Sequence, residues 1–386
     1  MNPRVALVHD WLTGYRGGEK VLAALCGLYP AAEIFTLVYV PGSCGPVIES
    51  RPIHTSFLQK LPNSQTQYRR YLPLFPLAIE RLELSGFDLV ISTSHAVAKG
   101  CRPAPGAVHI SYVHTPMRYV WDQFDAYFGP GRAGLPTRAA AHLVAPALRR
   151  WDVRSTRRIG ALIANSQFVS QRCARVWGRG ADAVVYPPVE TERFVPASDW
   201  SGEERSERGY ALIVSALVPY KRIDLAVRAF SRAGRRLVVA GGGPELSKLS
   251  NLAGPTVQVL GPVSDEQLLR LQQRAAFFVL PGEEDFGIAP LEAQSCGRPV
   301  LALGRGGALE TVRAAGPDAT GVFFDEPTEE ALLAALPAID RLARQSDPAA
   351  TRAWAERFSS ARFGPELSAQ LERLRARLAP TGSRAP

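Results

Sequence analysis

The feature that most constrains the fold is the alternation of short apolar, β-branched runs with longer helix-forming stretches along the 386 residues. Continuous apolar runs between helical segments indicate parallel strands that are buried on both faces. One series of such runs occurs in each half of the chain, so we predict an α/β protein with two doubly wound, Rossmann-like domains. The expected strands are Val5–His9, Ile34–Tyr39, Leu89–Thr93, Val108–Val113, Leu162–Ala164, Ala183–Tyr186, Ala211–Ala216, Arg236–Ala240, Val257–Leu260, Phe277–Leu280, Pro299–Ala302 and Val322–Phe324.

The length agrees with this division, because 386 residues suit two domains of roughly 150–200 residues each. Residues 191–209 are charged and lack a clean apolar period, so we expect an interdomain linker there. The expected organisation is an N-terminal domain over residues 1–195, a second domain over 196–345, and a helical segment over 346–386. That last segment would pack back on the N-terminal domain.

Composition narrows the possible partners and compartment. No run of about 18 apolar residues occurs, and the N-terminus lacks the apolar core and cleavage site of a signal peptide, so we expect a cytoplasmic protein. The five cysteines are scattered and form no CxxC, which argues against disulfides and a zinc site. A net charge of +9 favours anionic partners: nucleotide phosphates, nucleic acid or an anionic membrane surface. No nucleic-acid-binding module is recognisable, so nucleic acid rests on charge alone.

An acidic loop follows the expected strand that ends at Leu280. It carries Glu284, and Glu292 lies eight positions later on the helix that follows. Carboxylates accept hydrogen bonds from sugar and ribose hydroxyls, and backbone N–H groups at the start of the helix can hold a phosphate. An acidic loop before a solvated helix face is an equally good interpretation of this segment alone.

A basic turn follows the first expected strand of the second domain. Lys221 at this strand–helix junction can neutralise a diphosphate, and Arg222 lies beside it for a second contact. An isolated Lys-Arg pair is more often a solvated turn. Two weaker segments lie in the first domain: Gly17-Gly18, in a loop directly after the first strand, and His114, beside Pro116 and a cluster of arginine and aromatic residues.

These segments together resemble the retaining glycosyltransferases of family 4, which adopt the GT-B fold with two Rossmann-like domains facing across a cleft. The E-x7-E spacing of Glu284 and Glu292 is similar to the signature of that family. The resemblance implies that Glu284 contacts the donor sugar, Glu292 the donor ribose, Lys221 the diphosphate, and His114 the neighbourhood of the transferred sugar. Catalytic roles are therefore expected for Glu284, His114 and Lys221. Ala216 stands where the family usually has an arginine.

The resemblance extends to further donor-binding positions, most of them in glycine-rich loops after strands. These positions are Glu292, Arg222, Phe286, Gly287, Ile288, Gly17, Gly18, Gly242, Val263, Gly306 and Gly307. Val263 lies where the family usually grips the base through backbone groups.

The activity that the resemblance implies is transfer of a sugar from a nucleotide diphosphate donor to a glycan or lipid-linked acceptor, with retention at the anomeric carbon. Bacterial mannosyltransferases for O-antigen (lipopolysaccharide) or exopolysaccharide are the most similar subgroup. They suggest GDP-mannose, with a UDP-sugar as second choice. Neither a cofactor nor a metal is expected, because the nucleotide-sugar is a substrate and basic groups can carry the charge. Aromatic and basic stretches at 68–77 and 149–158 fit either peripheral contact with the inner membrane or interior helices with basic rims.

Two other functions remain open at this point. A nucleotide-sugar epimerase of the same architecture would bind the donor and need no acceptor. A non-catalytic nucleotide-sugar-binding protein is the third possibility, although the set of Glu284, Glu292 and Lys221 argues against it. A dehydrogenase is a weaker candidate, because neither domain begins with GxGxxG.

Overall fold

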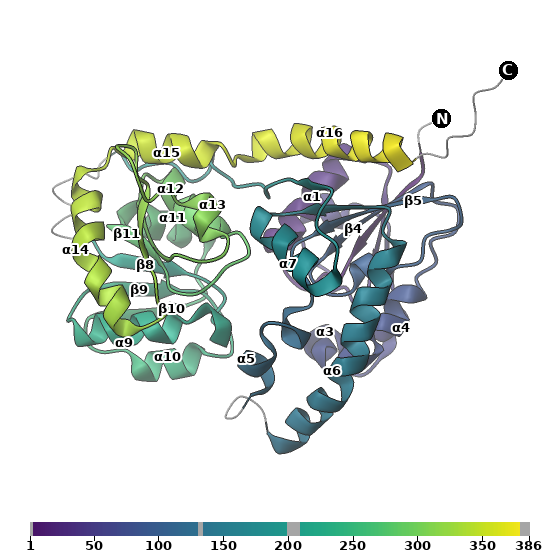
Figure 1. Cartoon of the computed structure of the whole chain (residues 1–386), viewed down its shortest axis with the longest axis horizontal. Coiled ribbons are helices and arrows are strands. Elements are labelled where there is room, and N and C mark those ends of the chain that lie inside the picture. The colour runs from purple at the N-terminus through teal and green to yellow at the C-terminus, as the bar shows by residue number, and fades with distance from the viewer. Residues whose placement is uncertain (1–2, 130–133, 199–208, 379–386) are drawn as a thin grey trace. The chain divides into compact units, whose positions relative to one another are not determined.

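The computed structural model describes residues 3–129, 134–198 and 209–378 (Figure 1). The chain forms two compact units: unit 1 comprises Met1–Pro187 with Phe363–Pro386, and unit 2 comprises Pro188–Arg362. The boundaries therefore differ from those expected at 195/196 and 345/346. The first differs because Arg352 donates hydrogen bonds to the carbonyls of Thr191 and Phe194, and both of these residues are buried in unit 2.

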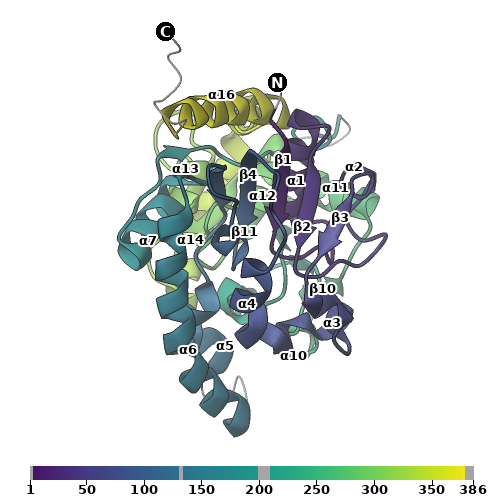
Figure 2. The same ribbon diagram turned by 90° about the vertical axis from the view of Figure 1, so that its right-hand side faces the viewer.

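Unit 1 is built on a seven-stranded parallel sheet in the order β3-β2-β1-β4-β5-β6-β7. Figure 2 shows β1 between β2 and β4, with β3 outside β2. The strand order reverses between β1 and β4, and open parallel sheets bind ligands outside the carboxyl ends of the strands at such a switch point. The strands are β1 (Val5–His9), β2 (Glu33–Thr36), β3 (Ile53–Thr55), β4 (Leu89–Ser94), β5 (Val108–Val113), β6 (Ala161–Ala164) and β7 (Ala183–Val184).

Helices pack on this sheet because successive strand residues point to opposite faces and both faces are apolar. Ala6 and Val8 join one core cluster, whereas Val5 and Leu7 join another. The α-helices are α1 (Gly17–Leu28), α2 (Pro46–Glu49), α3 (Ser64–Gln67), α4 (Phe75–Glu80), α5 (Phe124–Phe128), α6 (Leu135–Ser155) and α7 (Gln167–Trp177). The 3-10 segments are η1 (Phe57–Lys60), η2 (Tyr68–Leu74), η3 (Ala98–Gly100), η4 (Arg118–Val120) and η5 (Thr156–Arg158).

Unit 2 repeats this plan with six parallel strands in the order β10-β9-β8-β11-β12-β13, so its switch point lies between β8 and β11. The strands are β8 (Ala211–Val214), β9 (Leu237–Ala240), β10 (Val257–Gly261), β11 (Phe277–Leu280), β12 (Val300–Leu303) and β13 (Gly321–Phe324). Its helices are η6 (Pro219–Lys221), α9 (Ile223–Arg232), α10 (Leu246–Leu252), α11 (Asp265–Arg274), α12 (Ile288–Ser295), α13 (Ala308–Thr311), α14 (Glu329–Gln345) and α15 (Pro348–Glu356).

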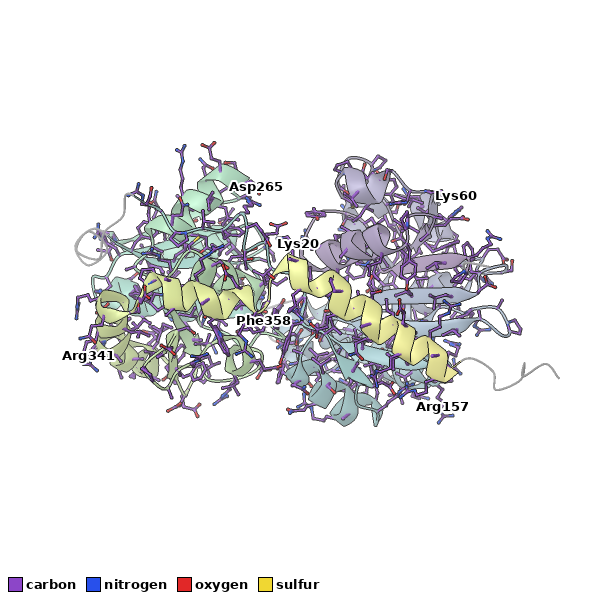
Figure 3. All side chains as sticks on the ribbon, turned by 90° about the horizontal axis from the view of Figure 1, so that it is seen from above. Lys20, Lys60, Arg157, Asp265, Arg341 and Phe358 are labelled. Carbon is purple, nitrogen blue, oxygen red and sulfur yellow. The ribbon has the colours of Figure 1, made fainter. Side chains whose placement is uncertain are left out.

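The C-terminal segment consists of two helices rather than one continuous stretch. Helix α15 packs on α12 in unit 2, and α16 (Ser360–Leu378) begins after a break at Arg357–Ser359. Phe363, Leu367 and Leu371 of α16 are buried in a core cluster of unit 1, where Figure 3 shows the helix lying across the strands. The apolar face of α16 thus completes the covering of the first sheet.

The predicted α/β class and the two doubly wound sheets are confirmed. Each of the twelve expected strands is present, with ends that differ by a few residues. The sequence interpretation missed β3, a three-residue edge strand in which His54 and Thr55 are exposed. Among the described residues, no helix combines the length and the apolar character needed to cross a bilayer.

Candidate active site

At the switch point of unit 2, the loop after β8 lies against the loop after β11. The Lys221 ammonium forms an ion pair with the Glu284 carboxylate, and both side chains are mostly buried. A Cβ atom added to Gly282 would lie 2.6 Å from the carbonyl oxygen of Lys221, so the backbones approach too closely for a larger residue. The structure therefore brings together two of the three residues for which the sequence predicted catalysis.

A third loop supports this pair from the neighbouring strand β12. The N–H of Gly307 donates to the carbonyl oxygen of Glu284 at 2.8 Å, and Gly306 forms a parallel bridge with Glu284. Gly306 has a φ of 68°, and a Cβ there would lie 2.4 Å from that same carbonyl oxygen. Loop packing thus accounts for both predicted glycines without any ligand, because no other residue fits this approach.

The predicted donor-binding residues around α12 lie in two settings: some are at the start of the helix, and one has a buried aromatic ring. Gly287, with a φ of 96°, precedes the first helical residue Ile288, and Glu292 is only 7% exposed on the second turn. The Phe286 ring is buried against Phe358, with ring centroids 5.7 Å apart. The Phe286 ring therefore belongs to the core, and donor binding at this position remains a prediction that would involve the backbone of Phe286.

Arg222 has an unusual backbone for its residue type. Its φ is 52°, in the left-handed region that costs a non-glycine residue free energy. It caps the N-terminus of α9, and its Nε lies 3.5 Å from Asp224 Oδ1, while the side chain is 39% exposed. Strained residues of this kind cluster at functional sites, which supports a ligand-binding role for this turn.

Gly242 and Val263 lie in the loops after β9 and β10. A Cβ on Gly242 would meet the Pro262 ring at 3.1 Å, so these two loops also touch. Both residues are partly exposed. The structure thus places all of the predicted second-domain positions in loops after strands or on the helices that follow them, with the ion pair at the switch point.

The switch point of unit 1 gathers four titratable side chains that the sequence interpretation did not select. They are His9, the last residue of β1, Asp10 directly after it, Glu19 on α1, and His95 directly after β4. Three selected positions, Gly17, Gly18 and His114, lie beside them. A Cβ on Gly18 would lie 3.4 Å from Cε1 of His9 and 3.6 Å from Nε2 of His114, so glycine lets α1 begin against both rings. Gly17 is the first residue of the same helix.

Burial and neighbouring charges set the protonation of this cluster. Burial raises the pKa of Glu19, but the His9 contact and the nearby His95 outweigh it and bring the pKa down to about 2. Burial, reinforced by His95 and His9, lowers the pKa of His114 to about 3. His114 is therefore neutral near pH 7, and within the described residues its buried Nε2 has no hydrogen-bond partner. Such a ring can exchange hydrogen bonds with a sugar hydroxyl but is a poor proton donor.

The order of the strands is the signal that would have identified this cluster. His9 ends the first strand and Asp10 follows it, His95 follows the fourth strand, and the doubly wound plan makes these two strands neighbours. The sequence interpretation treated 92–99 as equally suited to helix capping and ligand contact. Ser166, another segment of that kind, does cap α7 by accepting from the N–H of Val169 at 3.0 Å.

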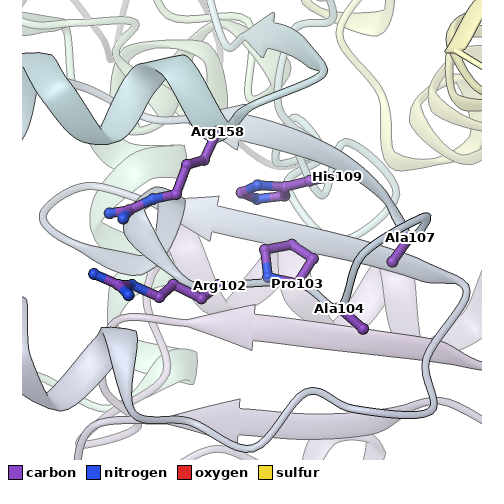
Figure 4. Close-up of a pocket in the computed structure, with 6 residues that line it drawn as sticks. All are labelled: Arg102, Pro103, Ala104, Ala107, His109 and Arg158. Carbon is purple, nitrogen blue, oxygen red and sulfur yellow. The ribbon is translucent and has the colours of Figure 1, made fainter.

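A cavity of about 500 Å³ lies at the opposite edge of the unit 1 sheet, among residues that precede β5 and β6 (Figure 4). Its two arginines, Arg102 and Arg158, both pair with the Glu80 carboxylate, and His109 shares a 2.9 Å hydrogen bond with the Ser92 hydroxyl. The cavity lies at the amino ends of the strands, away from the edge where parallel sheets bind their ligands.

Comparison with known proteins identifies the fold family. The model described as Glycosyltransferase Family 4 matches residues 15–193, and that described as Glycosyl transferases group 1 matches residues 195–347. The chain belongs to the family 4 glycosyltransferases of the GT-B fold. Solved structures agree with the fold: Anabaena HepE in complex with UDP and glucose has a TM-score of 0.68 at 16% identity. The structural match covers 96% of this chain and 100% of HepE.

Two curated relatives of this family 4 chain match parts of it. A Mycolicibacterium smegmatis GDP-mannose-dependent alpha-(1-6)-phosphatidylinositol monomannoside mannosyltransferase is 33% identical over 171 residues, which are 38% of this chain and 45% of the relative. D-inositol 3-phosphate glycosyltransferase 2 of Catenulispora acidiphila is 30% identical over 234 residues, which are 53% of this chain and 52% of the relative. The chain spans about half the length of the curated relatives it matches.

Proposed function

We propose that this protein is a retaining hexosyltransferase that moves a sugar from a nucleotide diphosphate donor to a hydroxyl of a glycan or lipid-linked acceptor. GDP-mannose is the first candidate donor and a UDP-sugar the second, and the pathway is cell-surface polysaccharide synthesis, of either lipopolysaccharide or exopolysaccharide. The name of one curated relative specifies GDP-mannose, which supports that donor as the first candidate.

The observation that carries the proposal is the Lys221–Glu284 pair at the switch point of unit 2. A nucleotide-sugar presents a diphosphate to a cation and sugar hydroxyls to a carboxylate. Lys221, with Arg222 beside it, can take the diphosphate, while Glu284 accepts the hydroxyls. A single nucleotide-sugar therefore offers a new partner to each member of the ion pair, the diphosphate to Lys221 and the hydroxyls to Glu284.

In the proposed reaction, the bond from the anomeric carbon to the departing phosphate oxygen breaks while the acceptor oxygen bonds to the same face. The acceptor proton passes to a phosphate oxygen of the leaving nucleotide diphosphate. Lys221 and Arg222 stabilise the charge that develops on that phosphate. Neutral His114 orients the sugar through hydrogen bonds. We propose that no metal ion is needed, because these cationic groups perform its electrostatic role.

The first experiment measures nucleotide release from GDP-mannose, UDP-glucose and UDP-N-acetylglucosamine in EDTA, with and without vesicles of a bacterial lipid extract. Release from one donor that requires the vesicles is expected, with loss of at least about 100-fold in Lys221→Ala and Glu284→Ala, since each removes a charge-assisted contact in the transition state. Lys248→Ala is the matched control, because Lys248 pairs with Glu245 at 3.1 Å in the same unit and is half exposed. Its rate should equal that of the wild type.

Other outcomes of the same assay would replace the proposal. Epimerisation of the donor without an acceptor would establish the epimerase. Tight donor binding without release, under any of these conditions, would support a binding protein. An anomeric proton signal that shows inversion in the product would contradict retention. A requirement for added Mg²⁺ would contradict a metal-independent reaction.

We also infer that the protein works in the cytoplasm, associated peripherally with the inner membrane. Leu143 and Leu135 are 81% and 76% exposed on α6, a helix that also carries several arginines. Apolar side chains among cations suit an anionic bilayer surface. Flotation with phosphatidylglycerol vesicles should carry the wild type upward, and Leu143→Glu should reduce that fraction. Equal flotation of both proteins would contradict this role for α6.

A further inference from the structure

Asp10 is an unusually saturated carboxylate at the switch point of unit 1. Its Oδ2 accepts hydrogen bonds from the backbone N–H groups of His95 and Ala96 at 2.7 and 2.9 Å. Its Oδ1 accepts from those of Val97 and Ala98 at 2.6 and 2.7 Å. The side chain is fully buried. One carboxylate at the end of β1 therefore fixes the whole turn that follows β4.

The same carboxylate holds the ring of the first residue in that turn. Nδ1 of His95 lies 3.1 Å from Asp10 Oδ2. The Asp10 carboxylate accepts from four N–H groups and therefore also acts as the acceptor in its contact with the His95 ring. The proton in that contact must then lie on Nδ1. In the neutral ring, Nε2 then has a lone pair and no proton. Trp11 packs edge-on against the His95 ring, with centroids 4.4 Å apart, and supports this orientation of the imidazole.

The second nitrogen of this ring has no assigned partner. Across the described parts of the chain, the structure records no hydrogen bond to Nε2 of His95, although the side chain is only 29% exposed. The ring lies between two other imidazoles, with centroids 5.9 Å from His9 and 6.3 Å from His114. It therefore stands beside the ring that the resemblance places near the transferred sugar.

His95 is neutral under ordinary conditions. Burial is the main effect and lowers its pKa; Asp10 and Glu19 oppose that effect, whereas His9 and Arg118 reinforce it. These groups lie on the elements around the ring: the end of β1, helix α1 and turn η4. Because the pKa is below its usual value of 6.5, the ring loses its extra proton before pH 7.

We propose that Nε2 of His95 accepts a hydrogen bond from a hydroxyl of the acceptor substrate, and that Asp10 is the positioning residue that fixes this nitrogen as an acceptor. The inference rests on the proposed transferase function and adds to it a recognition contact for the second substrate, a sugar or polyol hydroxyl. Lys221 and Glu284 of unit 2 take the diphosphate and hydroxyls of the donor, and His114 of unit 1 orients the donor sugar, so the neighbouring His95 ring is left for a hydroxyl of the acceptor.

Two substitutions separate recognition of the hydroxyl from support of the turn. Asn at position 95 places its amide near Nδ1, where it can still donate to Asp10, but it has nothing at the position of Nε2. Gln reaches that position and offers a carbonyl oxygen. At saturating GDP-mannose, with vesicles of bacterial lipid extract as the varied acceptor, His95→Asn should lower kcat/KM for the acceptor about tenfold, and His95→Gln should restore most of it.

The control and the donor kinetics complete the test. His54→Asn alters another histidine that pairs with a carboxylate, Glu33 at 2.8 Å, on the edge strand β3, and should leave the kinetics unchanged. The KM for GDP-mannose should be the same in all variants. Equal kcat/KM in wild type and His95→Asn would overturn the inference, and so would His95→Gln being no better than His95→Asn.

A substrate-free measurement separates this inference from the proposed function. In the full-length protein labelled with ¹⁵N-histidine, the His95 ring should show a protonated Nδ1 and a bare Nε2 at pH 7.5. A protonated Nε2 would refute the inference even in an active enzyme. Conversely, a wild-type protein that transfers no sugar to any acceptor would refute the proposed function, and with it the role given to Nε2.

Discussion

A buried ion pair in unit 1 allows a stability prediction with a worked magnitude. Lys99, which is 1% exposed, pairs with fully buried Asp152 at 2.9 Å. Its ammonium also donates to the Asp152 carbonyl and to the Ser155 hydroxyl at 2.9 and 2.6 Å. The other Asp152 oxygen accepts from the indoles of Trp121 and Trp177. The pair therefore joins η3, α6 and α7 through one buried charge network.

Lys99→Met keeps the apolar length of the side chain and removes its charge. Leaving one buried charge without its partner costs about 3–5 kcal/mol. Asp152 would retain two indole N–H donors, so we expect the lower end, about 3 kcal/mol. The double variant Lys99→Met/Asp152→Asn should lose less than the sum of the two single variants, because neither charge then remains alone.

The assay is urea unfolding followed by tryptophan fluorescence, since Trp151 and Trp177 lie against the Lys99 ammonium. Hydrogen exchange of the α6 and α7 amides should show the same loss and would locate it in unit 1, which matters because a two-unit chain need not unfold in one step. Lys60→Met, at an exposed lysine, should change stability by less than about 0.5 kcal/mol. A Lys99→Met protein within about 1 kcal/mol of the wild type would refute this account of the network.

Three further predictions concern the two switch points. Gly306→Ala should destabilise unit 2 and lower the transfer rate, because its φ of 68° and the 2.4 Å approach to Glu284 O leave no room for a methyl group; an unchanged thermal midpoint would contradict this. Glu19 has a folded pKa of about 2 against 4.5, so its stabilisation is complete above pH 4.5 and is lost as the pH falls toward 2, and Glu19→Gln should flatten the unfolding free energy in that window. His114 has a folded pKa of about 3 against 6.5, so stability should fall as the pH drops from 6.5 toward 3, and His114→Gln should make that slope shallower; denaturant titrations across pH test both.

The strands were predictable because a parallel strand covered on both faces must be a continuous apolar run. The first strand shows this, since Val5 through His9 are all buried. The edge strand β3 was not predicted from the sequence, because His54 and Thr55 are exposed and the segment therefore contains no continuous apolar run. The linker was misplaced for a related reason: Phe194 looks isolated in a charged stretch, and only Arg352, 158 residues later, shows that this segment belongs to unit 2.

The proximity of candidate site residues was predictable where they follow a motif along the chain, and not where it depends on distant neighbours. Lys221 and Glu284 match a family pattern, and the structure places them together. Phe286 lies within the same motif, yet its ring packs on Phe358, and no local pattern distinguishes a core ring from one that faces a ligand. The bond between Asp10 and the N–H of His95 spans 85 residues, so it becomes visible only when β1 and β4 pair.

The two switch points use one arrangement for two different purposes. In each unit, a charged or polar pair joins the loop after the first strand to the loop after the fourth: Asp10 with His95, and Lys221 with Glu284. Asp10 is saturated by four backbone N–H groups, so a ligand that displaced His95 would leave the carboxylate in place. The side chains of Lys221 and Glu284 are 16% and 12% exposed, and an anion that takes Lys221 alone would leave a mostly buried carboxylate without its cation. A ligand that brings hydroxyls together with the diphosphate avoids that cost. Under the proposed function, the pair in unit 2 would favour an intact nucleotide-sugar over the free nucleotide diphosphate, which is the preference that a transferase needs in order to bind its donor and release its product.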